Sequence, residues 1–348
     1  MNPAQLDERN INARDIEELI GALSDLEVDG IIEHKPSQCA SKGPVSEELL
    51  EEEDLMKEEK PSVSAEQVAA IRAAWSRRPE DERVCYDPLA RHFLGPELGG
   101  VIDDPKLTET VAAAVEESTP GAIGCVGART RYIDDYLKTC IDDGIEQLVI
   151  LGAGYDSRPY RFSEMKGNVR VFELDQPATQ REKIEILKMI LGSTPEHVVY
   201  VPINFDKESI ADRLYASGFN RDLKTLFIWE GVTMYITAEA VDATLGFVAE
   251  NSGKGSSIIF NYILQSVVDG TYRTEDAEKM RQSYAQRGEP LIFGIPEGAI
   301  DAFLSERGFC NVKDVNGEFF RSAYFKGKIA STNVCCLCGF VTASVKPN

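Results

Sequence analysis

The sequence predicts a doubly wound α/β fold built around a mostly parallel sheet of seven strands. From residue 146 onwards, short apolar runs alternate with helical stretches of about 10–15 residues, a rhythm typical of βαβ units. The first of these runs leads into a glycine turn, and turns of this kind line the ligand-binding edge of open α/β sheets. The apolar runs carry few polar residues, as expected of strands that helices cover on both faces.

The first 62 residues differ in composition from the rest of the 348-residue chain. They contain 17 acidic and 6 basic residues, and no aromatic residue occurs before residue 64. Such a segment buries too little apolar surface to offset the entropy of ordering it. We expect residues 1–62 to form an acidic, mostly disordered tail, with one short amphipathic helix at 13–26.

The rest of the chain, residues 63–348, is expected to form one domain. Its first part, 64–140, predicts a helical lead-in, because apolar residues recur there at helical spacing. Ser64 is the expected N-cap of the first helix. Later helical stretches are expected at 112–115 and 132–140.

The core of the sheet is expected at residues 146–263. The predicted strands are 147–151, 168–174, 198–203, 226–229 and 256–263, and the helices between them are 178–191, 207–217 and 238–250. These lengths fit buried parallel strands joined by crossover helices.

The insertion at 264–296 interrupts this rhythm. It is polar and long for a connection, which is typical of a lid over a binding site. The last part, 297–348, completes a helix at 296–309 that Gly308 closes. Two late strands, at 311–316 and 333–343, are expected to lie at one edge of the sheet.

The composition argues against several partners. A net charge of −21 without a run of five basic residues disfavours nucleic acid. No apolar run is long enough to span a membrane, and residues 1–10 lack the apolar stretch of a signal peptide. We expect a cytoplasmic protein.

The eight cysteines predict no metal site. Only Cys335, Cys336 and Cys338 cluster, and the three histidines lie far apart in sequence. We expect Cys336 and Cys338 to face one side of a strand as buried, reduced thiols.

Four glycine or acidic residues mark the carboxyl edge of the predicted sheet. Gly152 and Gly154 follow the first strand, where glycine lets a backbone approach a ligand closely. Asp175 ends the second strand, where an acidic residue accepts hydrogen bonds from ribose hydroxyls, or else caps the next helix. Glu230 lies at the end of the fourth strand, where its carboxylate would either face a ligand or cap or pair with a group in the same turn. A structural turn remains the alternative for the glycines.

These positions belong to a set of motifs that resembles the leucine carboxyl methyltransferase family, and in particular its microbial branch that acts on small molecules. The motifs are DPLA at 87–90, ART at 128–130, DD at 134–135, LGAGYDSR at 151–158, FELDQP at 172–177 and EGVTMY at 230–235. The resemblance spans about residues 64–343. It implies a class I methyltransferase fold, which is Rossmann-like, and S-adenosyl-L-methionine as cofactor.

The resemblance also implies roles for individual residues. Arg129 would pair with the carboxylate of the cofactor, Asp175 would hold its ribose, and Glu230 would line its pocket. Arg72 corresponds to a basic residue near the same carboxylate, although its spacing to Asp87 differs from the family pattern. After the third strand the family usually has Asp followed by an apolar residue.

This sequence departs from the family at that point. It has Asn204 and Phe205, so an adenine contact would rest on the Asn204 carbonyl, with Asp206 as a substitute. If Arg129 binds the cofactor, Arg129→Ala is expected to weaken binding and barely change the melting of the empty protein. A surface ion pair with Asp134 or Asp135 is the alternative for Arg129.

The methyl acceptor is left open, as is the oligomeric state. A carboxylate or hydroxyl on a small molecule or a protein C-terminus fits the resemblance, with Tyr235 as the candidate acceptor contact. A nicotinamide-dependent oxidoreductase would use the same glycines and Asp175, but Ser157 replaces the third glycine of its usual pattern. A catalytically silent interaction protein of the same fold is a third hypothesis.

Overall fold

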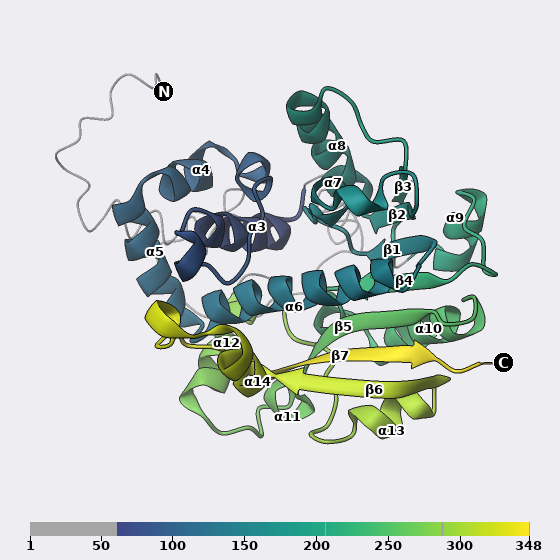
Figure 1. Ribbon diagram of the computed structural model, residues 1–348. Coiled ribbons are helices and arrows are strands. Elements are labelled where there is room, and N and C mark those ends of the chain that lie inside the picture. Colours follow the sequence, from purple (N-terminus) through teal and green to yellow (C-terminus); the bar gives the residue numbers. More distant parts are fainter. Residues whose placement is uncertain (1–60, 206, 287–288, 348) are drawn as a thin grey trace, which may run out of the picture.

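The structure is a computed structural model that describes residues 61–205, 207–286 and 289–347 (Figure 1). The predicted tail up to residue 60, with its helix at 13–26, lies outside the described residues. In the described part, seven strands form one sheet in the order β3-β2-β1-β4-β5-β7-β6. The pairings are parallel except those that β7 makes with β5 and β6, which are antiparallel. The predicted mostly parallel seven-stranded sheet is confirmed.

The strands are short and, in the centre of the sheet, buried. They are β1 (Gln147–Leu151), β2 (Arg170–Asp175), β3 (Val198–Pro202), β4 (Thr225–Trp229), β5 (Ser257–Ile263), β6 (Phe309–Asn316) and β7 (Cys338–Val345). Every residue of β1, β4 and β5 is buried. This explains their continuous apolar sequence, because both faces of a parallel sheet are covered.

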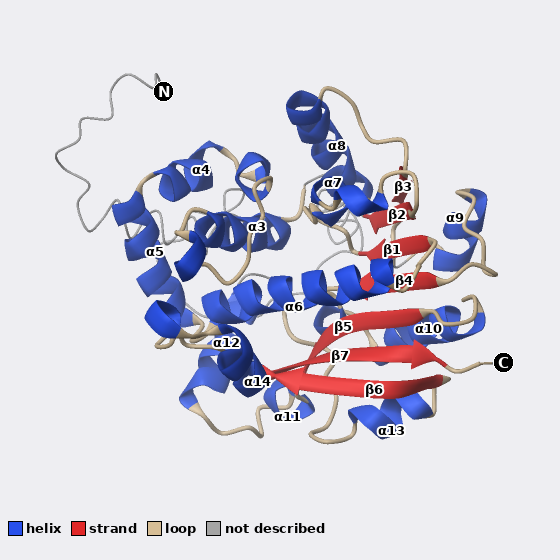
Figure 2. Cartoon of the chain, in the orientation of Figure 1, coloured by secondary structure: helices blue, strands red, loops and turns tan. Residues whose placement is uncertain are grey.

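Helices surround the sheet (Figure 2). The α-helices are α3 (Val63–Ser76), α4 (Pro96–Asp103), α5 (Pro105–Ser118), α6 (Ala122–Asp142), α7 (Arg158–Arg161), α8 (Pro177–Leu191), α9 (Ile210–Ala216), α10 (Ala238–Glu250), α11 (Gln265–Val268), α12 (Glu275–Gln286), α13 (Ile300–Ser305) and α14 (Gly317–Tyr324). Short 3-10 helices are η2 (Glu80–Glu82), η3 (Ala90–Phe93), η4 (Ser163–Met165), η5 (Thr233–Tyr235) and η6 (Gly327–Ile329).

Two apolar clusters form the core, one on each face of the sheet. The larger joins α3, α6, α8, α12 and α14 to alternate residues of the strands, such as Leu148 and Ile150. The other joins α9, α10 and α13 to the intervening residues, such as Val149 and Leu151. This alternation follows from strand geometry, because successive side chains of a strand point to opposite faces of the sheet and both faces are covered.

A charged pair is buried beside the first cluster. Lys183 of α8 lies 2.8 Å from Glu173 of β2, and both side chains are almost fully buried. Tyr160 also donates to Glu173. Burial raises the pKa of Glu173 to about 7, against the opposing charge of Lys183.

The helical lead-in is confirmed as α3 to α6, with a different cap. Ser62, not Ser64, is the N-cap of α3, and its side chain accepts from the Ala65 N–H. Both late lead-in helices are longer than predicted, because Pro105 begins α5 at its N-terminus and Gly121 begins the turn into α6.

Three elements are shorter than predicted. The helix expected at 296–309 is only α13, because Gly298 has a positive φ of 72° and interrupts its start. The helix expected at 207–217 is α9, which begins after the cap Ser209. Of the strand expected at 333–343, only the part from Cys338 onwards pairs in the sheet.

The residues before β7 pack elsewhere, so the expectation for the cysteines was partly wrong. The Cys335 N–H donates to the carbonyl of Gly121, at the start of α6. Cys335 is buried, whereas Cys336 lies outside the strand and is half-buried, as is Cys338. The two cysteines therefore do not share one face of a strand.

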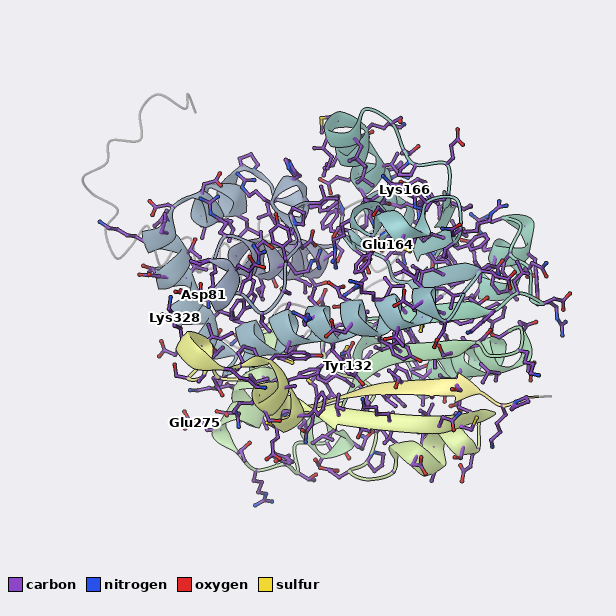
Figure 3. The ribbon with its side chains drawn as sticks, viewed as in Figure 1. Asp81, Tyr132, Glu164, Lys166, Glu275 and Lys328 are labelled. Atoms are coloured by element: carbon purple, nitrogen blue, oxygen red, sulfur yellow. The ribbon has the colours of Figure 1, made fainter. Side chains whose placement is uncertain are left out.

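The lead-in and the insertion both lie at the carboxyl ends of the parallel strands, on the left in Figure 1. Helix α5 contacts α12 of the insertion. Lys328 of η6 forms surface ion pairs with Asp81 (3.0 Å) and Glu82 (2.7 Å) of η2, which join the lead-in to the C-terminal part (Figure 3). In the part of the chain that the structure describes, none of the helices has the length and apolar character needed to span a membrane.

Candidate active site

The glycine turn after β1 adopts a conformation that favours glycine. Gly152 has a φ of 69° and Gly154 a φ of 43°. A Cβ atom on Gly152 would lie 2.6 Å from Val232 Cγ2, and one on Gly154 would lie 3.1 Å from Ala65 Cβ. The Gly154 N–H donates to Asp175 Oδ2. The turn and the end of β2 therefore form one unit, which leaves no room for side chains.

Asp175 is a buried carboxylate at the carboxyl end of β2. Its Oδ1 accepts from the Gln176 N–H at 2.6 Å. Burial raises its pKa, while the N–H groups of Gly154 and Gln176 oppose the shift. Asp175 thus caps local backbone, and it also stands where a ribose-binding carboxylate stands in folds of this class.

The glycine turn departs from the predicted strand–turn–helix pattern. The next helix, α7, begins six positions after Gly152 and has only four residues. Asp156 holds its start, because its Oδ1 accepts from the Arg158 N–H at 2.8 Å. The turn is therefore not followed by a long helix whose N-terminus could face an anion.

Glu230 is the centre of a buried ionic network at the end of β4. Its Oε1 lies 2.6 Å from Arg129 Nε, and its Oε2 lies 2.8 Å from Arg158 Nη1. Arg158 also pairs with Asp134 (2.7 Å) and Asp156 (2.6 Å). The network joins α6, the glycine turn and β4, three segments far apart in sequence.

The arginines keep Glu230 ionised. Burial alone would raise the pKa of Glu230, but Arg129 and Arg158 hold it well below its ordinary value. Burial likewise lowers the pKa of Arg129, and Glu230 outweighs that effect and raises it. Within the described residues, Arg129 donates only through Nε, and its side chain is 11% exposed. Its two terminal nitrogens therefore keep donors for a ligand.

The alternative reading of Arg129 as a surface ion pair on its own helix is wrong. Asp134 is engaged by Arg158 and Arg161, and Asp135 by Arg131. Arg129 instead reaches across to β4.

Arg72 has a different environment. Its Nε lies 2.9 Å from Asp87 Oδ2, and its Nη2 donates to the Tyr155 carbonyl at 2.6 Å. Arg72 is buried and ties α3 to the glycine turn. It is close enough to Glu230 to contribute to that residue's low pKa.

Tyr235 and the insertion meet at this site. Tyr235 is half-buried in η5, and its ring centre lies 6.0 Å from that of Tyr284 in α12. Tyr284 is also near enough to Arg129 to influence its pKa. After α12, the N–H of Ile292 donates to the Met234 carbonyl. The predicted insertion thus lies beside the predicted acceptor contact.

Asn204 and Phe205 follow β3, next to Asp175 across the sheet. The Asn204 N–H donates to Glu208 Oε2 at 2.9 Å. Phe205 is half-buried against the apolar cluster of α9 and α10. Asp206, the suggested substitute, lies outside the described residues. The adenine contact at this position stays a prediction.

The geometry fits the family that the motifs indicated. A family model described as "Leucine carboxyl methyltransferase" matches residues 65–249, which include the glycine turn, Arg129, Asp175 and Glu230. The chain belongs to the leucine carboxyl methyltransferase family.

Curated relatives of this family member carry consistent names. The chain is 31% identical to a Bacillus subtilis protein named "Putative S-adenosyl-L-methionine-dependent methyltransferase YktD", over 63% of this chain and 71% of that protein. It is 32% identical to a protein of Mycobacterium sp. (strain JLS) with the same descriptive name, over 71% of this chain and 83% of that protein.

Solved structures support the fold. A structure described as a putative methyltransferase, from Thermobifida fusca YX, has a TM-score of 0.53 at 12% identity, covering 83% of this chain and 96% of that one. A DUF574 family protein from Streptomyces avermitilis has a TM-score of 0.50 at 15% identity, covering 80% and 97%. The family member therefore has the class I methyltransferase fold.

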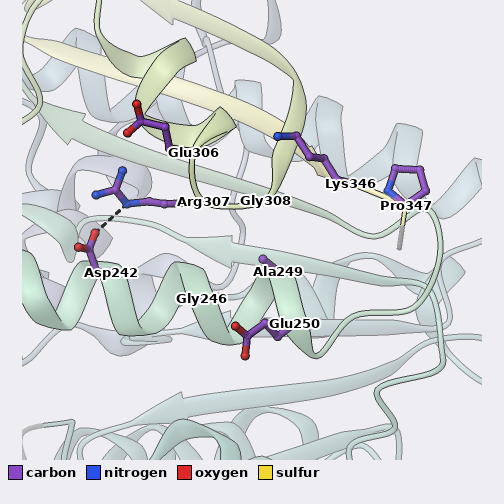
Figure 4. Close-up of a pocket in the computed structure, with 9 residues that line it drawn as sticks. All are labelled: Asp242, Gly246, Ala249, Glu250, Glu306, Arg307, Gly308, Lys346 and Pro347. Carbon is purple, nitrogen blue, oxygen red and sulfur yellow. Dashed lines mark hydrogen bonds and ion pairs between the residues drawn. The ribbon is translucent and has the colours of Figure 1, made fainter.

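A groove elsewhere on the molecule lacks these features. It has a volume of about 810 Å³ and lies between α10 and the ends of α13 and β7 (Figure 4). Arg307 pairs there with Asp242 at 2.7 Å, and Lys346 donates to the Ser305 carbonyl at 2.6 Å. Its basic groups are engaged, and it lies far from the carboxyl edge that holds the motifs.

Sequence reasoning missed two residues of the site. Arg158 lies inside the LGAGYDSR motif, yet its role as the partner of Glu230 depends on a contact over 72 positions. Tyr284 lies in the insertion, and only its position beside Tyr235 reveals it. The motif could have directed attention to Arg158, whereas no sequence signal marks Tyr284.

Proposed function

We propose that this family member is an O-methyltransferase that uses S-adenosyl-L-methionine to methylate an oxygen, preferably a carboxylate, of a small molecule. The observation that carries the proposal is Arg129, held by Glu230 with its terminal nitrogens free of other described partners. That arrangement presents a planar guanidinium suited to binding a carboxylate, such as the one in the amino-acid part of S-adenosyl-L-methionine.

The residues at the carboxyl edge fit the cofactor. Arg129 would hold its amino-acid carboxylate, and Asp175 its ribose hydroxyls. Gly152 and Gly154 leave the backbone bare beneath it, because a Cβ on either would crowd a neighbour. Asn204 and Phe205 would border its base. When bound, S-adenosyl-L-methionine supplies a sulfonium methyl group that is already activated for displacement.

The titrating groups favour an acceptor that is ionised beforehand. A hydroxyl acceptor requires a general base, whereas a carboxylate does not. Glu230 is committed to two arginines, and its low pKa makes it a poor base at neutral pH. The histidines of the described part do not help: His92 is exposed in η3, and His197 contacts the Pro159 carbonyl before β3. The chain's contribution is therefore to orient the acceptor and exclude water, with Tyr235 as the acceptor contact.

Cofactor binding tests the proposal first. We expect S-adenosylhomocysteine at 100 times its dissociation constant to stabilise the protein by about 2.7 kcal/mol, which raises Tm by about 5 °C for a domain of this size. NAD and NADP are the comparison ligands. A shift with a dinucleotide and none with S-adenosylhomocysteine would favour an oxidoreductase, and a shift with neither would favour a silent interaction protein.

Methyl transfer tests the acceptor class. Methyl-labelled cofactor should transfer label to members of a panel of small carboxylic acids, and mild base should release it as methanol because the product is an ester. Label that resists mild base, on phenols or alcohols, would refute the carboxylate preference while leaving methyl transfer intact. Label on peptides ending in a free carboxylate, and not on small acids, would replace the small-molecule acceptor by a protein C-terminus.

A further inference from the structure

Arg158 is a buried arginine at the start of α7, after the glycine turn, and its side chain is only 3% exposed. Its Nε lies 2.7 Å from Asp134 Oδ1. Its Nη1 lies 2.6 Å from Asp156 Oδ2 and 2.8 Å from Glu230 Oε2. Its Nη2 donates to the Thr130 carbonyl at 3.5 Å, the longest of these contacts. Every nitrogen of this guanidinium is therefore engaged within the protein.

Arg129 differs from Arg158 in the donors that it keeps. Among the described residues, Arg129 donates to Glu230 through Nε alone. A Cβ atom built on Gly231 would lie 4.0 Å from each terminal nitrogen of Arg129, so these nitrogens lie beside the turn that follows β4. The Gly231 N–H fixes that turn by donating to Asn261 Oδ1 at 2.7 Å. Arg129 can therefore offer its terminal nitrogens to a ligand at the carboxyl edge, whereas each nitrogen of Arg158 already has an acceptor.

Four charged side chains form a closed ring through three elements. Arg129 and Asp134 both lie on α6, Glu230 follows β4, and Arg158 begins α7. The contacts run from Arg129 to Glu230 at 2.6 Å, from Glu230 to Arg158 at 2.8 Å, and from Arg158 to Asp134 at 2.7 Å. Charges of opposite sign alternate around this ring, so each buried charge has a partner on either side or along the same helix.

The ring gives Glu230 one fixed orientation. Each of its two oxygens accepts from a different arginine, Oε1 from Arg129 and Oε2 from Arg158. Without Arg158, the carboxylate would be held at one oxygen only and could rotate about its terminal bond. Arg129, which is bound through a single nitrogen, would then lose a defined direction as well.

We propose that Arg158 is a positioning residue for the cofactor: it holds Glu230, and through Glu230 it directs the guanidinium of Arg129 at the cofactor carboxylate. A planar guanidinium binds a carboxylate best in one relative orientation. A side chain that is already ordered loses less rotamer freedom when the ligand binds. The inference rests on the carboxylate contact proposed above for Arg129.

Arg161 provides a matched control on the same short helix. Its side chain is 10% exposed, and both its terminal nitrogens donate to Asp134 at 2.7 Å. Its Nε donates to Ser157 Oγ at 3.0 Å. Within the described residues, Arg161 makes no bond to Glu230. A change at Arg161 should therefore loosen the packing of α7 on α6 as a change at Arg158 does, while leaving Glu230 in place.

Calorimetric titration of the full-length parent, Arg158→Lys and Arg161→Lys with S-adenosylhomocysteine tests the proposal. A lysine keeps the charge but has one nitrogen, so it cannot replace the separate arginine nitrogens that reach Asp134 and Glu230. We expect Arg158→Lys to weaken binding by about tenfold, a size typical of coupled residues in one network. Both variants should melt below the parent, and Arg161→Lys should bind as tightly as the parent.

A double-mutant cycle with Arg129→Ala separates positioning from a structural effect. If Arg158 acts on the cofactor through Arg129, adding Arg158→Lys to Arg129→Ala should weaken binding further by less than about twofold. Losses that multiply would show that Arg158 acts by another route and would overturn the proposal. Parent-like binding by Arg158→Lys would also overturn it, as would an equal loss of affinity in Arg161→Lys.

Two comparisons keep the outcomes distinct. A parent protein that does not bind S-adenosylhomocysteine would refute the proposed function and this inference with it, whereas a parent that binds, followed by any contrary result above, refutes the inference alone. If Arg158→Lys does not fold, the titrations are repeated in an Asp156→Asn background, where one buried carboxylate fewer needs a cation. There too, Arg158→Lys should weaken binding relative to Asp156→Asn, and unchanged binding would contradict the positioning role.

Discussion

Replacing Arg129 by alanine removes one arm of the Glu230 network and the proposed partner of the cofactor carboxylate. A hydrogen bond between charged groups contributes about 1.5–3 kcal/mol, so binding of S-adenosylhomocysteine should weaken by about 10- to 150-fold. Glu230 keeps its bond to Arg158 at 2.8 Å. The variant should therefore avoid the full cost of a buried charge without a partner, which is about 3–5 kcal/mol.

The structure changes one expectation for this variant. From sequence, Arg129→Ala should barely affect the melting of the empty protein. Because Arg129 is paired with a buried carboxylate at 2.6 Å, we now expect a loss of about 1–3 kcal/mol, which lowers Tm by about 2–6 °C. Arg129→Lys should recover part of both losses, since an ammonium lacks the planar fork of a guanidinium.

Calorimetric titration with S-adenosylhomocysteine and a melting curve of the empty protein measure the two effects. Arg131→Ala is the matched control, because Arg131 lies two positions away with a half-exposed side chain, paired with Asp135 on its own helix. It should change stability by less than about 0.5 kcal/mol and leave affinity unchanged. If Arg129→Ala melts lower yet binds as tightly as the parent, Arg129 only positions Glu230, and the proposed carboxylate contact is wrong.

Four further outcomes are expected. Gly152→Ala should lower both Tm and cofactor affinity, because Gly152 has a positive φ and an added Cβ would lie too close to Val232. The control is Gly246→Ala in α10, which has open space around it and should leave Tm unchanged or slightly higher. The Tm difference between the parent and Glu230→Gln should be constant above about pH 5 and shrink below about pH 4, since a carboxylate whose folded pKa is lowered loses its contribution as the pH falls. Hydrogen exchange in 264–296 should slow when S-adenosylhomocysteine and an acceptor are both bound; fast exchange in the ternary complex would contradict a lid. Removal of residues 1–60 should leave a folded protein with the same affinity, and a tenfold loss in titration would show that the tail completes the site.

The central strands illustrate how far sequence patterns reached. The apolar runs at 147–151 and 226–229 predicted β1 and β4 to within a residue, because strands buried on both faces must be continuously apolar. The helix predicted at 238–250 matches α10 to the residue, and in the structure Thr237 caps it. Failures occurred where local pattern and tertiary pairing disagree, as at 333–337, whose backbone bonds with Gly121, just before α6, and Leu264, just after β5, are not those of a strand in the sheet.

The candidate site divides in the same way. Spacing along the chain located Gly152, Asp175 and Glu230, because parallel strands place their carboxyl ends at one edge. It did not indicate that Arg158 and Arg129 share Glu230, nor that Tyr284 lies beside Tyr235. Those contacts join segments tens of residues apart.

The sequence by itself determined the α/β class, the order of the central strands and helices, and the family motifs at the carboxyl edge. These follow from periodicity and from turn residues, which act over a few positions. Only the tertiary structure decided which charges meet. Lys183 shows why: its helix is patterned as amphipathic, yet the lysine is buried 2.8 Å from Glu173. A buried charge is tolerated when a partner on another element neutralises it, and that condition is set by packing in three dimensions.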